Sequence, residues 1–172
     1  MKPWMHGFDL KVAAIIQARM GSSRFPGKML AKLAGRPLID WVVMRVLQAQ
    51  TLSQVVLATT NQAEDNRLVE YAKEKGLNVF RGSESDVLGR IWKAAQPLKV
   101  DAVVRVCADN PFIDWREIDR LVKFFEKNDP DYAFNHLDRM GNGYADGFGA
   151  EMISTSLLSK LADSVTSVEE RE

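Results

Sequence analysis

The residues best suited to chemistry lie in one short segment, residues 14–32, where an apolar run passes directly into a polar loop. The loop combines cations, glycines and hydroxyl groups in Arg19, Gly21, Ser22, Ser23, Arg24, Gly27 and Lys28. Between Lys11 and Ile39 the chain has six Lys or Arg residues and no Asp or Glu. Backbone amides, hydroxyls and cations together favour an anion that carries several charges, and a triphosphate has these properties.

Two common phosphate-binding motifs do not fit this loop. Around the pair Gly27-Lys28, a Walker A motif would need a glycine at Ser22 and a hydroxyl residue at Met29. A Rossmann fingerprint needs G-x-G-x-x-G, and the spacing from Gly21 to Gly27 differs from it. The loop therefore predicts an anion site of another kind.

A solvated surface loop is the alternative interpretation, because most Arg and Lys side chains lie at the surface. The position of the loop favours binding, since it follows Val12–Gln17, an almost continuous apolar run typical of a strand that is buried on both faces. Ligands of parallel sheets bind at the carboxyl ends of the strands. The same rule places Thr59-Thr60 and Cys107–Asn110 at that edge.

Strand and helix patterns alternate along the chain. Strands are predicted at Val12–Gln17, Val55–Thr59, Asn78–Arg81 and Ala102–Cys107, with Asp131–Asn135 as a fifth. Helices are predicted from Pro37 to about Gln50, from Asn61 to Gly76, from Ser85 or Asp86 to Pro97, after Asp114, and from Val168. Asn61, Ser85 or Asp86, Asp114 and Ser167 are the expected N-caps. This alternation indicates an α/β fold with a mostly parallel sheet.

Composition limits the class of protein. The chain has 172 residues, of which 46% are apolar and 27% charged, and this fits one domain. Because 23 Lys and Arg balance 23 Asp and Glu, we expect no nucleic-acid partner. A single cysteine, Cys107, excludes an internal disulfide, and two histidines make a zinc cluster implausible.

Hydropathy gives no sign of export or of a membrane partner. No apolar run approaches the roughly 18 residues of a membrane span, and Met1–Lys11 lacks the apolar region of a signal peptide. A chain with these features is expected in the cytoplasm.

Three segments in order resemble the sugar-activating cytidylyltransferases. They are IIQARMGSSRFPGKMLAKLAGRPLIDW (15–41), FRGSESDVLGRIWKAA (80–95) and VVRVCADNPFID (103–114). This family includes the 3-deoxy-manno-octulosonate and acylneuraminate cytidylyltransferases, and the likeness is strongest to its spore coat polysaccharide biosynthesis protein F branch. The resemblance implies a Rossmann-like nucleotidyltransferase fold of the glycosyltransferase-A type, a three-layer αβα sandwich. It also implies CTP as donor, a sugar or sugar acid as acceptor, and Mg²⁺ as cofactor.

The resemblance assigns roles to individual residues. Nucleotide-binding positions are Ala18, Arg19, Gly21, Ser22, Arg24, Lys28 and Arg90. Arg19 and Lys28 are also expected to be catalytic, because they would hold the phosphates that leave as pyrophosphate. Asp109 follows a buried strand by two residues, which suits either a cation that prefers oxygen ligands or an ordinary turn before Asn-Pro. The resemblance favours a catalytic Asp109 that binds Mg²⁺, and it makes Asp146 and Glu151 acceptor-binding residues.

Two departures from the family pattern stand near the end of the chain. Ala145 replaces a proline, and Gly149 replaces an acidic residue. Relatives continue for some tens of residues and carry a second metal-binding aspartate there. We therefore expect residues 1–172 to form a single nucleotidyltransferase domain that lacks the C-terminal part of the family.

The expected reaction is transfer of CMP from CTP to a sugar or sugar acid with release of pyrophosphate, for polysaccharide or surface glycan synthesis. Alternatives are a metal-dependent glycosyltransferase of the same fold and a nucleotide-binding module without catalysis. The first usually has an Asp-x-Asp pair at its metal, which Asp109-Asn110-Pro111 lacks. A homodimer is a possible assembly.

Overall fold

A six-stranded sheet forms the centre of the computed structural model, which describes residues 10–22, 24–136, 141 and 147–171. Its strand order is β5 (Asn78–Gly82), β4 (Gln54–Thr60), β1 (Val12–Gln17), β6 (Ala102–Cys107), β8 (Glu151–Ser154) and β7 (Tyr132–Phe134). Strands β5, β4, β1 and β6 pair in parallel, whereas β8 is antiparallel to both β6 and β7. The sheet is mainly parallel, as the alternating pattern predicted.

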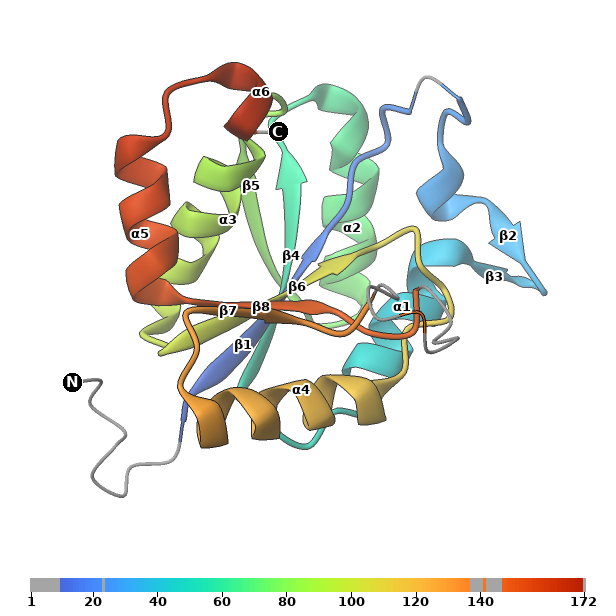
Figure 1. The fold of residues 1–172 in the computed structure, drawn as a ribbon. Coiled ribbons are helices and arrows are strands. Elements are labelled where there is room, and N and C mark those ends of the chain that lie inside the picture. The colour runs from blue at the N-terminus through green and yellow to red at the C-terminus, as the bar shows by residue number, and fades with distance from the viewer. Residues whose placement is uncertain (1–9, 23, 137–140, 142–146, 172) are drawn as a thin grey trace.

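Helices cover both faces of this sheet (Figure 1). One face is covered by α1 (Leu38–Val46), α2 (Asn66–Glu74) and α4 (Trp115–Asn128), and the other by α3 (Val87–Ala95) and α5 (Thr155–Ser164). Shorter elements are the ribbon β2 (Lys32–Leu33) and β3 (Arg36–Pro37), the 3-10 helices η2 (Lys28–Leu30), η3 (Ala63–Asp65) and η4 (Gln96–Leu98), and α6 (Val168–Arg171). The predicted three-layer αβα architecture is confirmed. Within the described ranges, no helix has the length and apolar character needed to cross a bilayer.

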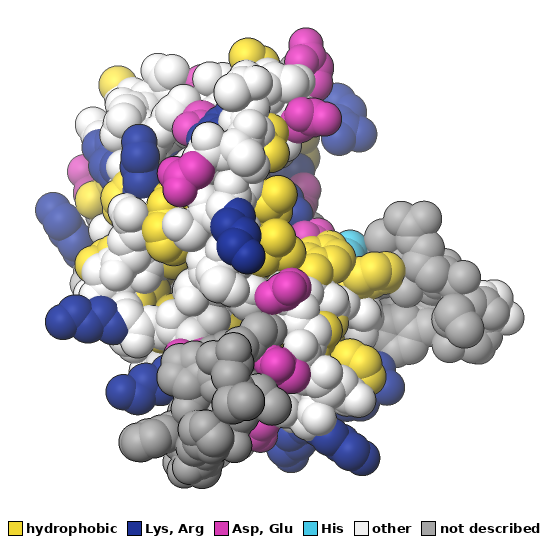
Figure 2. All heavy atoms as spheres, turned by 60° about the vertical axis from the view of Figure 1, so that its left-hand side comes forward, with side chains coloured by type: hydrophobic (Ala, Val, Ile, Leu, Met, Phe, Trp, Pro, Cys, Tyr) yellow, Lys and Arg dark blue, Asp and Glu magenta, His cyan; other side chains and the backbone are white. Residues whose placement is uncertain are grey.

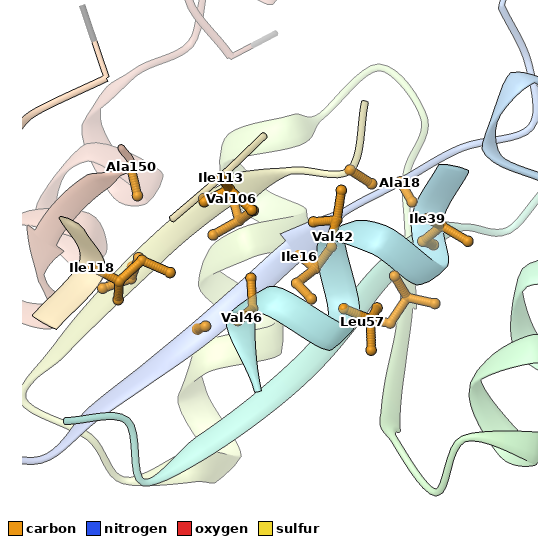
Figure 3. Close-up of a cluster of buried hydrophobic side chains, with 14 of the residues drawn as sticks. Ile16, Ala18, Ile39, Val42, Val46, Leu57, Val106, Ile113, Ile118 and Ala150 are labelled. Carbon is orange, nitrogen blue, oxygen red and sulfur yellow. The ribbon is translucent and has the colours of Figure 1, made fainter. Parts of the chain in front are cut away.

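The core explains why the first strand is a continuous apolar run. In β1, residues from Val12 to Ile16 are fully buried, because one set of side chains faces α1 and α4 and the other faces α3. Figure 3 shows Ile16 of β1 against Val42 of α1. Such two-sided burial fixes the strand, and with it the loop that leaves its carboxyl end.

The observed ends of two helices differ from the predicted ones. The helix after Pro37 ends at Val46, not near Gln50, and α2 begins only after η3. Asn61 does not cap α2, because α2 begins at Asn66 and Asp65 occupies its N-cap position. The backbone N–H of Asn61 donates to the Gly82 carbonyl (2.9 Å) and so extends the pairing of β4 with β5. Asp86 and Asp114 do cap α3 and α4, by accepting from the amides of Gly89 and Arg116.

Strand β8 and helix α5 were not predicted. Strand β8 has only four residues and follows a glycine-rich stretch, so it is too short for an alternating pattern to be recognised. Helix α5 does carry a capping signal, since the Ser154 hydroxyl accepts from the Leu157 amide (3.2 Å). On the edge strand β7, the ring of Tyr132 lies near that of Phe134 (centroids 6.0 Å apart), and the Phe134 ring lies near that of His136 beyond the strand (5.4 Å). Figure 2 shows hydrophobic side chains (yellow) beside the histidine (cyan) on this side of the molecule.

A buried polar contact joins α1 to α2. The Asp40 carboxylate accepts from the Tyr71 hydroxyl (2.9 Å) and pairs with the Lys75 ammonium (2.6 Å). Burial raises the pKa of Asp40, but the hydrogen bonds from Lys75 and Tyr71 outweigh burial, and the net pKa is lowered. The ionised carboxylate therefore stabilises the fold.

We expect Asp40→Ala to lower the free energy of unfolding at pH 7 by about 2 kcal/mol, because it leaves the buried Tyr71 hydroxyl without its acceptor. The folded-state pKa of Asp40 lies below its ordinary value of 3.8, so its contribution is present above that pH and is lost as the pH falls through the lower value. Urea denaturation of both proteins should show the difference shrinking below pH 3.8. The exposed Asp163→Ala serves as control, and a difference that does not depend on pH would contradict this account.

Candidate nucleotide site

The first loop, residues 18–27, leaves β1 at the carboxyl edge of the sheet and leads into η2. Its start is tied to the sheet, because the Ala18 amide donates to the Ala58 carbonyl of β4 (3.1 Å). Its end is tied to its start, because the Gly27 amide donates to the Met20 carbonyl (3.1 Å). The two ends of the loop are thus held together beside the end of β4.

A buried carboxylate holds the first loop on its inner side. Asp65, which has no exposed surface, accepts from the amide of Met20 (2.7 Å) and from the amide of Thr60 at the end of β4 (3.0 Å). It also accepts from the Thr60 hydroxyl. One side chain therefore sets the distance between the first loop and the neighbouring strand.

Most of the predicted nucleotide-binding residues line one cavity of about 260 Å³. Its lining includes Ala18, Arg19, Gly21, Ser22, Arg24 and Lys28 from the first loop and η2, and Asp109 from beyond β6. Gln17, Met29 and Cys107 complete it. Polar surface exceeds apolar surface in this cavity, as expected for a charged ligand.

Two cations of the acid-free segment form ion pairs with acids. The Lys28 ammonium lies 2.6 Å from an Asp109 carboxylate oxygen, and the Arg19 guanidinium lies 3.3 Å from Glu84. Both acids come from distant parts of the sequence. Such partly exposed pairs contribute little to stability, so a ligand with more negative charge can replace them.

Asp109 suits a magnesium ion better than a zinc ion. Its carboxylate is about half exposed at the cavity (48%). Among the residues that the structure describes, no three His, Cys, Asp or Glu side chains are grouped to hold a metal. Magnesium usually keeps several waters and binds through one or two carboxylates together with substrate phosphates, so a single carboxylate at a phosphate-sized cavity fits it.

Arg90 does not reach the cavity. It is 2% exposed, and its guanidinium donates to the backbone carbonyls of Ser83 and Glu84. Burial lowers the pKa of Arg90, and the nearby Arg19 lowers it further. The predicted contact between Arg90 and a nucleotide would therefore have to act through the loop that Arg90 holds.

That loop borders a second, more open polar hollow beside the cavity. The hollow is lined by Arg19, Asn61, Gln62, Ser83, Glu84 and Ser85. The Glu84 carboxylate links the hollow to the cavity, because it accepts from Arg19, which lines both, and from the side-chain amide of Gln62 (3.0 Å). Neither Gln62 nor Glu84 was identified from the sequence, because each is an ordinary surface residue type in its local context.

Glu151 lies at the start of β8, away from the cavity. Its carboxylate accepts from Arg105 of β6 (3.0 and 3.1 Å), and Arg105 also donates to Gln17 (3.1 Å), which lines the cavity. Glu151 itself borders a separate hollow of about 180 Å³ between α3 and the sheet. Asp146 and Ala145 lie outside the described residues, as does Ser23.

Gly149 has a structural reason to be glycine. A Cβ at this position would overlap the backbone and side-chain oxygens of Asn135. The Asn135 amide donates to the Ala150 carbonyl (3.1 Å), so the two segments run in close contact. The acidic side chain of the family pattern therefore has no room here.

Comparison with known proteins agrees with this geometry. The model of the family described as cytidylyltransferase matches residues 13–170. The chain belongs to the cytidylyltransferase family. The resemblance in the three ordered segments is thereby confirmed.

Individual relatives give the extent of the likeness. The chain is 37% identical over 124 residues to the spore coat polysaccharide biosynthesis protein SpsF of Bacillus subtilis, a match that covers 70% of this chain and 52% of SpsF. It is 36% identical over 119 residues to a 3-deoxy-manno-octulosonate cytidylyltransferase of Bdellovibrio bacteriovorus, covering 67% of this chain and 46% of that protein. The chain thus spans about half the length of these relatives.

Solved structures of cytidylyltransferases share the fold. A cytidylyltransferase from Leptospira borgpetersenii superposes with a TM-score of 0.86 at 34% identity, covering 95% of this chain and 68% of that one. The CTP complex of a CMP:2-keto-3-deoxy-manno-octonic acid synthetase gives a TM-score of 0.71 at 18% identity, covering 93% and 81% of the two chains. The expected nucleotidyltransferase fold is confirmed.

Asp65 offers the sharpest test of how this member of the cytidylyltransferase family holds its first loop. Asp65→Ala leaves two buried backbone amides without an acceptor, so we expect the free energy of unfolding to fall by about 3 kcal/mol. Hydrogen exchange at the Met20 amide should become much faster than exchange in β6. The exposed Glu70→Ala on the following helix, α2, is the control, and full protection of Met20 in the Asp65 variant would refute the assignment.

Proposed function

We propose that this chain is the nucleotide-binding part of an enzyme that transfers CMP from CTP to a hydroxyl group of a sugar or sugar acid. One observation carries the proposal: three cations of the first loop and η2 and the carboxylate of Asp109 line the same cavity, with Lys28 and Asp109 2.6 Å apart. The names of the relatives support CTP and a sugar acid as substrates. Glycan synthesis is the process in which such a product is used.

The phosphate chain would occupy the cavity. Arg19, Arg24 and Lys28 would neutralise the β- and γ-phosphates, and the hydroxyl of Ser22 would donate to a phosphate oxygen. The polar hollow beside it would take the cytidine, because the amides of Asn61 and Gln62 match the donors and acceptors of a pyrimidine. Arg19 lines both sites and would hold the junction between them.

The reaction needs alignment and charge neutralisation rather than a protein nucleophile. The acceptor oxygen forms a bond to the α-phosphorus, the bond from the α-phosphorus to the bridging oxygen breaks, and pyrophosphate leaves with the electron pair. The acceptor hydroxyl loses its proton to water. Cys107 is exposed at the cavity, but its surroundings raise the pKa of the thiol, chiefly by desolvation and against the opposing effect of Arg105, so little thiolate is available to remove this proton.

Asp109 would hold Mg²⁺. The ion would supply positive charge to the phosphates when bound. Asp109 would then exchange its Lys28 partner for the ion, and Lys28 would turn to the phosphate oxygens. The ion pair seen here thus keeps both groups at the cavity before the substrate arrives.

The acceptor would approach from the side of β6 and β8. Arg105 and Glu151 form a paired polar unit there, and Arg105 also contacts Gln17 at the cavity. We propose that Glu151, together with Asp146, takes part in acceptor binding.

Lys28→Ala tests the phosphate role. We expect turnover, measured as pyrophosphate release from CTP with Mg²⁺ and a panel of sugars and sugar acids, to fall about a hundredfold or more because a cation is lost from the leaving group. Circular dichroism should be unchanged, since Lys28 is partly exposed. Lys32→Ala is the matched control, because Lys32 is exposed in β2 and belongs to the same acid-free segment. Near-normal activity of the Lys28 variant would disprove the assignment.

Asp109→Asn tests the metal role without relying on activity. Binding of Mn²⁺ in the presence of CTP, followed by water proton relaxation, should weaken by at least about tenfold because the charged oxygen ligand that Asp109 supplies to the proposed site is lost. Glu126→Gln on α4 removes the same charge from an exposed position and should bind normally. Equal Mn²⁺ affinity in both variants would rule out Asp109 as the ligand.

A further inference from the structure

The short helix α6 is attached to the start of α3 by one side chain, Arg171. Its guanidinium donates to both carboxylate oxygens of Asp86, from Nε at 2.9 Å and from Nη2 at 3.2 Å. The remaining terminal nitrogen, Nη1, donates to the carbonyls of Ala162 (2.9 Å) and Val165 (2.6 Å) at the end of α5. Paired, forked contacts of this kind need an arginine.

Asp86 joins Arg171 to the first turn of α3. One of its oxygens also accepts from the Gly89 amide (2.8 Å), so the carboxylate that caps α3 is the one that Arg171 holds. The hydrogen bond from Arg171 is the main reason that the pKa of Asp86 is lowered. Gly89 makes this arrangement possible, because a Cβ at Gly89 would overlap the Asp86 carboxylate.

Asp86 ends the loop that borders the polar hollow, the Ser83–Asp86 loop. Within this loop the Asp86 amide donates to the Ser83 hydroxyl (3.2 Å), and Arg90 holds the carbonyls of Ser83 and Glu84 from the buried side. Glu84 then pairs with Arg19 of the first loop. A continuous series of polar contacts thus runs from α6 to a cation of the phosphate cavity.

We propose that Arg171 is a positioning residue for nucleotide binding, which acts through Asp86 to hold the Ser83–Asp86 loop and, through Glu84, the Arg19 side chain in the arrangement that receives CTP. This inference rests on the proposed function for its ligand. Helix α6 has only four residues, too few to persist on propensity alone, so its place depends on the contacts of Arg171. Without them, the loop would rest on the contacts of Arg90 and would be less ordered before the nucleotide binds, and the cost of ordering would weaken binding.

The effect should fall on binding rather than on the chemical step, because Arg171 touches no reacting atom. For Arg171→Ala we expect the KM and the dissociation constant for CTP to rise about tenfold, with kcat changed by less than about twofold. Arg171→Lys keeps the positive charge but cannot donate to both oxygens of Asp86 at once, so its KM and dissociation constant for CTP should lie between those of the wild type and Arg171→Ala. Lys160→Ala removes a cation from the exposed side of α5 and should behave as the wild type.

A second measurement needs no nucleotide. Hydrogen exchange in the free protein should become faster at the amides of Asp86, Gly89 and Arg90 in Arg171→Ala, while amides of β1 and β6 keep their protection. Gly89→Ala should produce the same pattern of exchange, because the added Cβ would displace the Asp86 carboxylate from its contact with Arg171. Because both changes break one contact, the double variant should be little worse than either single variant.

The outcomes separate the two proposals. Unchanged exchange around Asp86 in Arg171→Ala, or exchange that accelerates equally throughout the sheet, would overturn the positioning role. Local acceleration with unchanged affinity for CTP would also overturn it. If the wild-type protein neither binds nor consumes CTP, the proposed function fails and the ligand part of this inference fails with it, whereas the exchange data still decide whether Arg171 holds the loop.

Discussion

The arrangement of this site depends on one buried carboxylate, Asp65. Two backbone amides, that of Met20 in the first loop and that of Thr60 at the end of β4, would be costly to bury without an acceptor. Asp65 serves both, and it can do so only if the first loop and the end of β4 keep a fixed separation. Met20 and Met29 are buried beneath the loop, so its underside is apolar and its upper side carries the cations. The buried side of the loop is therefore fixed by Asp65 and by apolar packing, and its charged side chains lie on the opposite side.

The cations of the loop are balanced before any ligand is present. Lys28 is paired with Asp109 and Arg19 with Glu84, each across a long stretch of sequence. Mutual repulsion among the cations is reduced in this way, and their side chains are kept near the cavity. Under the proposed function, a metal-loaded triphosphate would suit such a site better than a bare anion, because it would bring a cation for Asp109 while Lys28 turned to phosphate.

Two arginines with very different sequence contexts hold the Ser83–Asp86 loop. Arg90 lies within a motif that resembles the family, and its burial shows that it supports the loop backbone from within. Arg171 lies near the end of the chain and holds the same loop through Asp86. On the opposite side, the contact of Gly149 with Asn135 restricts the β8 segment near Glu151. The polar groups of the site thus rest on backbone that is fixed by buried or half-buried contacts.

Local pattern determined a large part of this protein. The apolar runs of β1 and β6 predicted buried parallel strands, and the order of the motifs predicted the family and the cluster of Arg19, Lys28 and Asp109, because strand ends of a parallel sheet meet at one edge. Short-range signals also gave the caps Asp86 and Asp114. Tertiary structure alone decided the rest. Asp65, Glu84 and Arg171 are common residue types in unremarkable positions, and their roles come from contacts with segments tens of residues away, which no local spacing encodes.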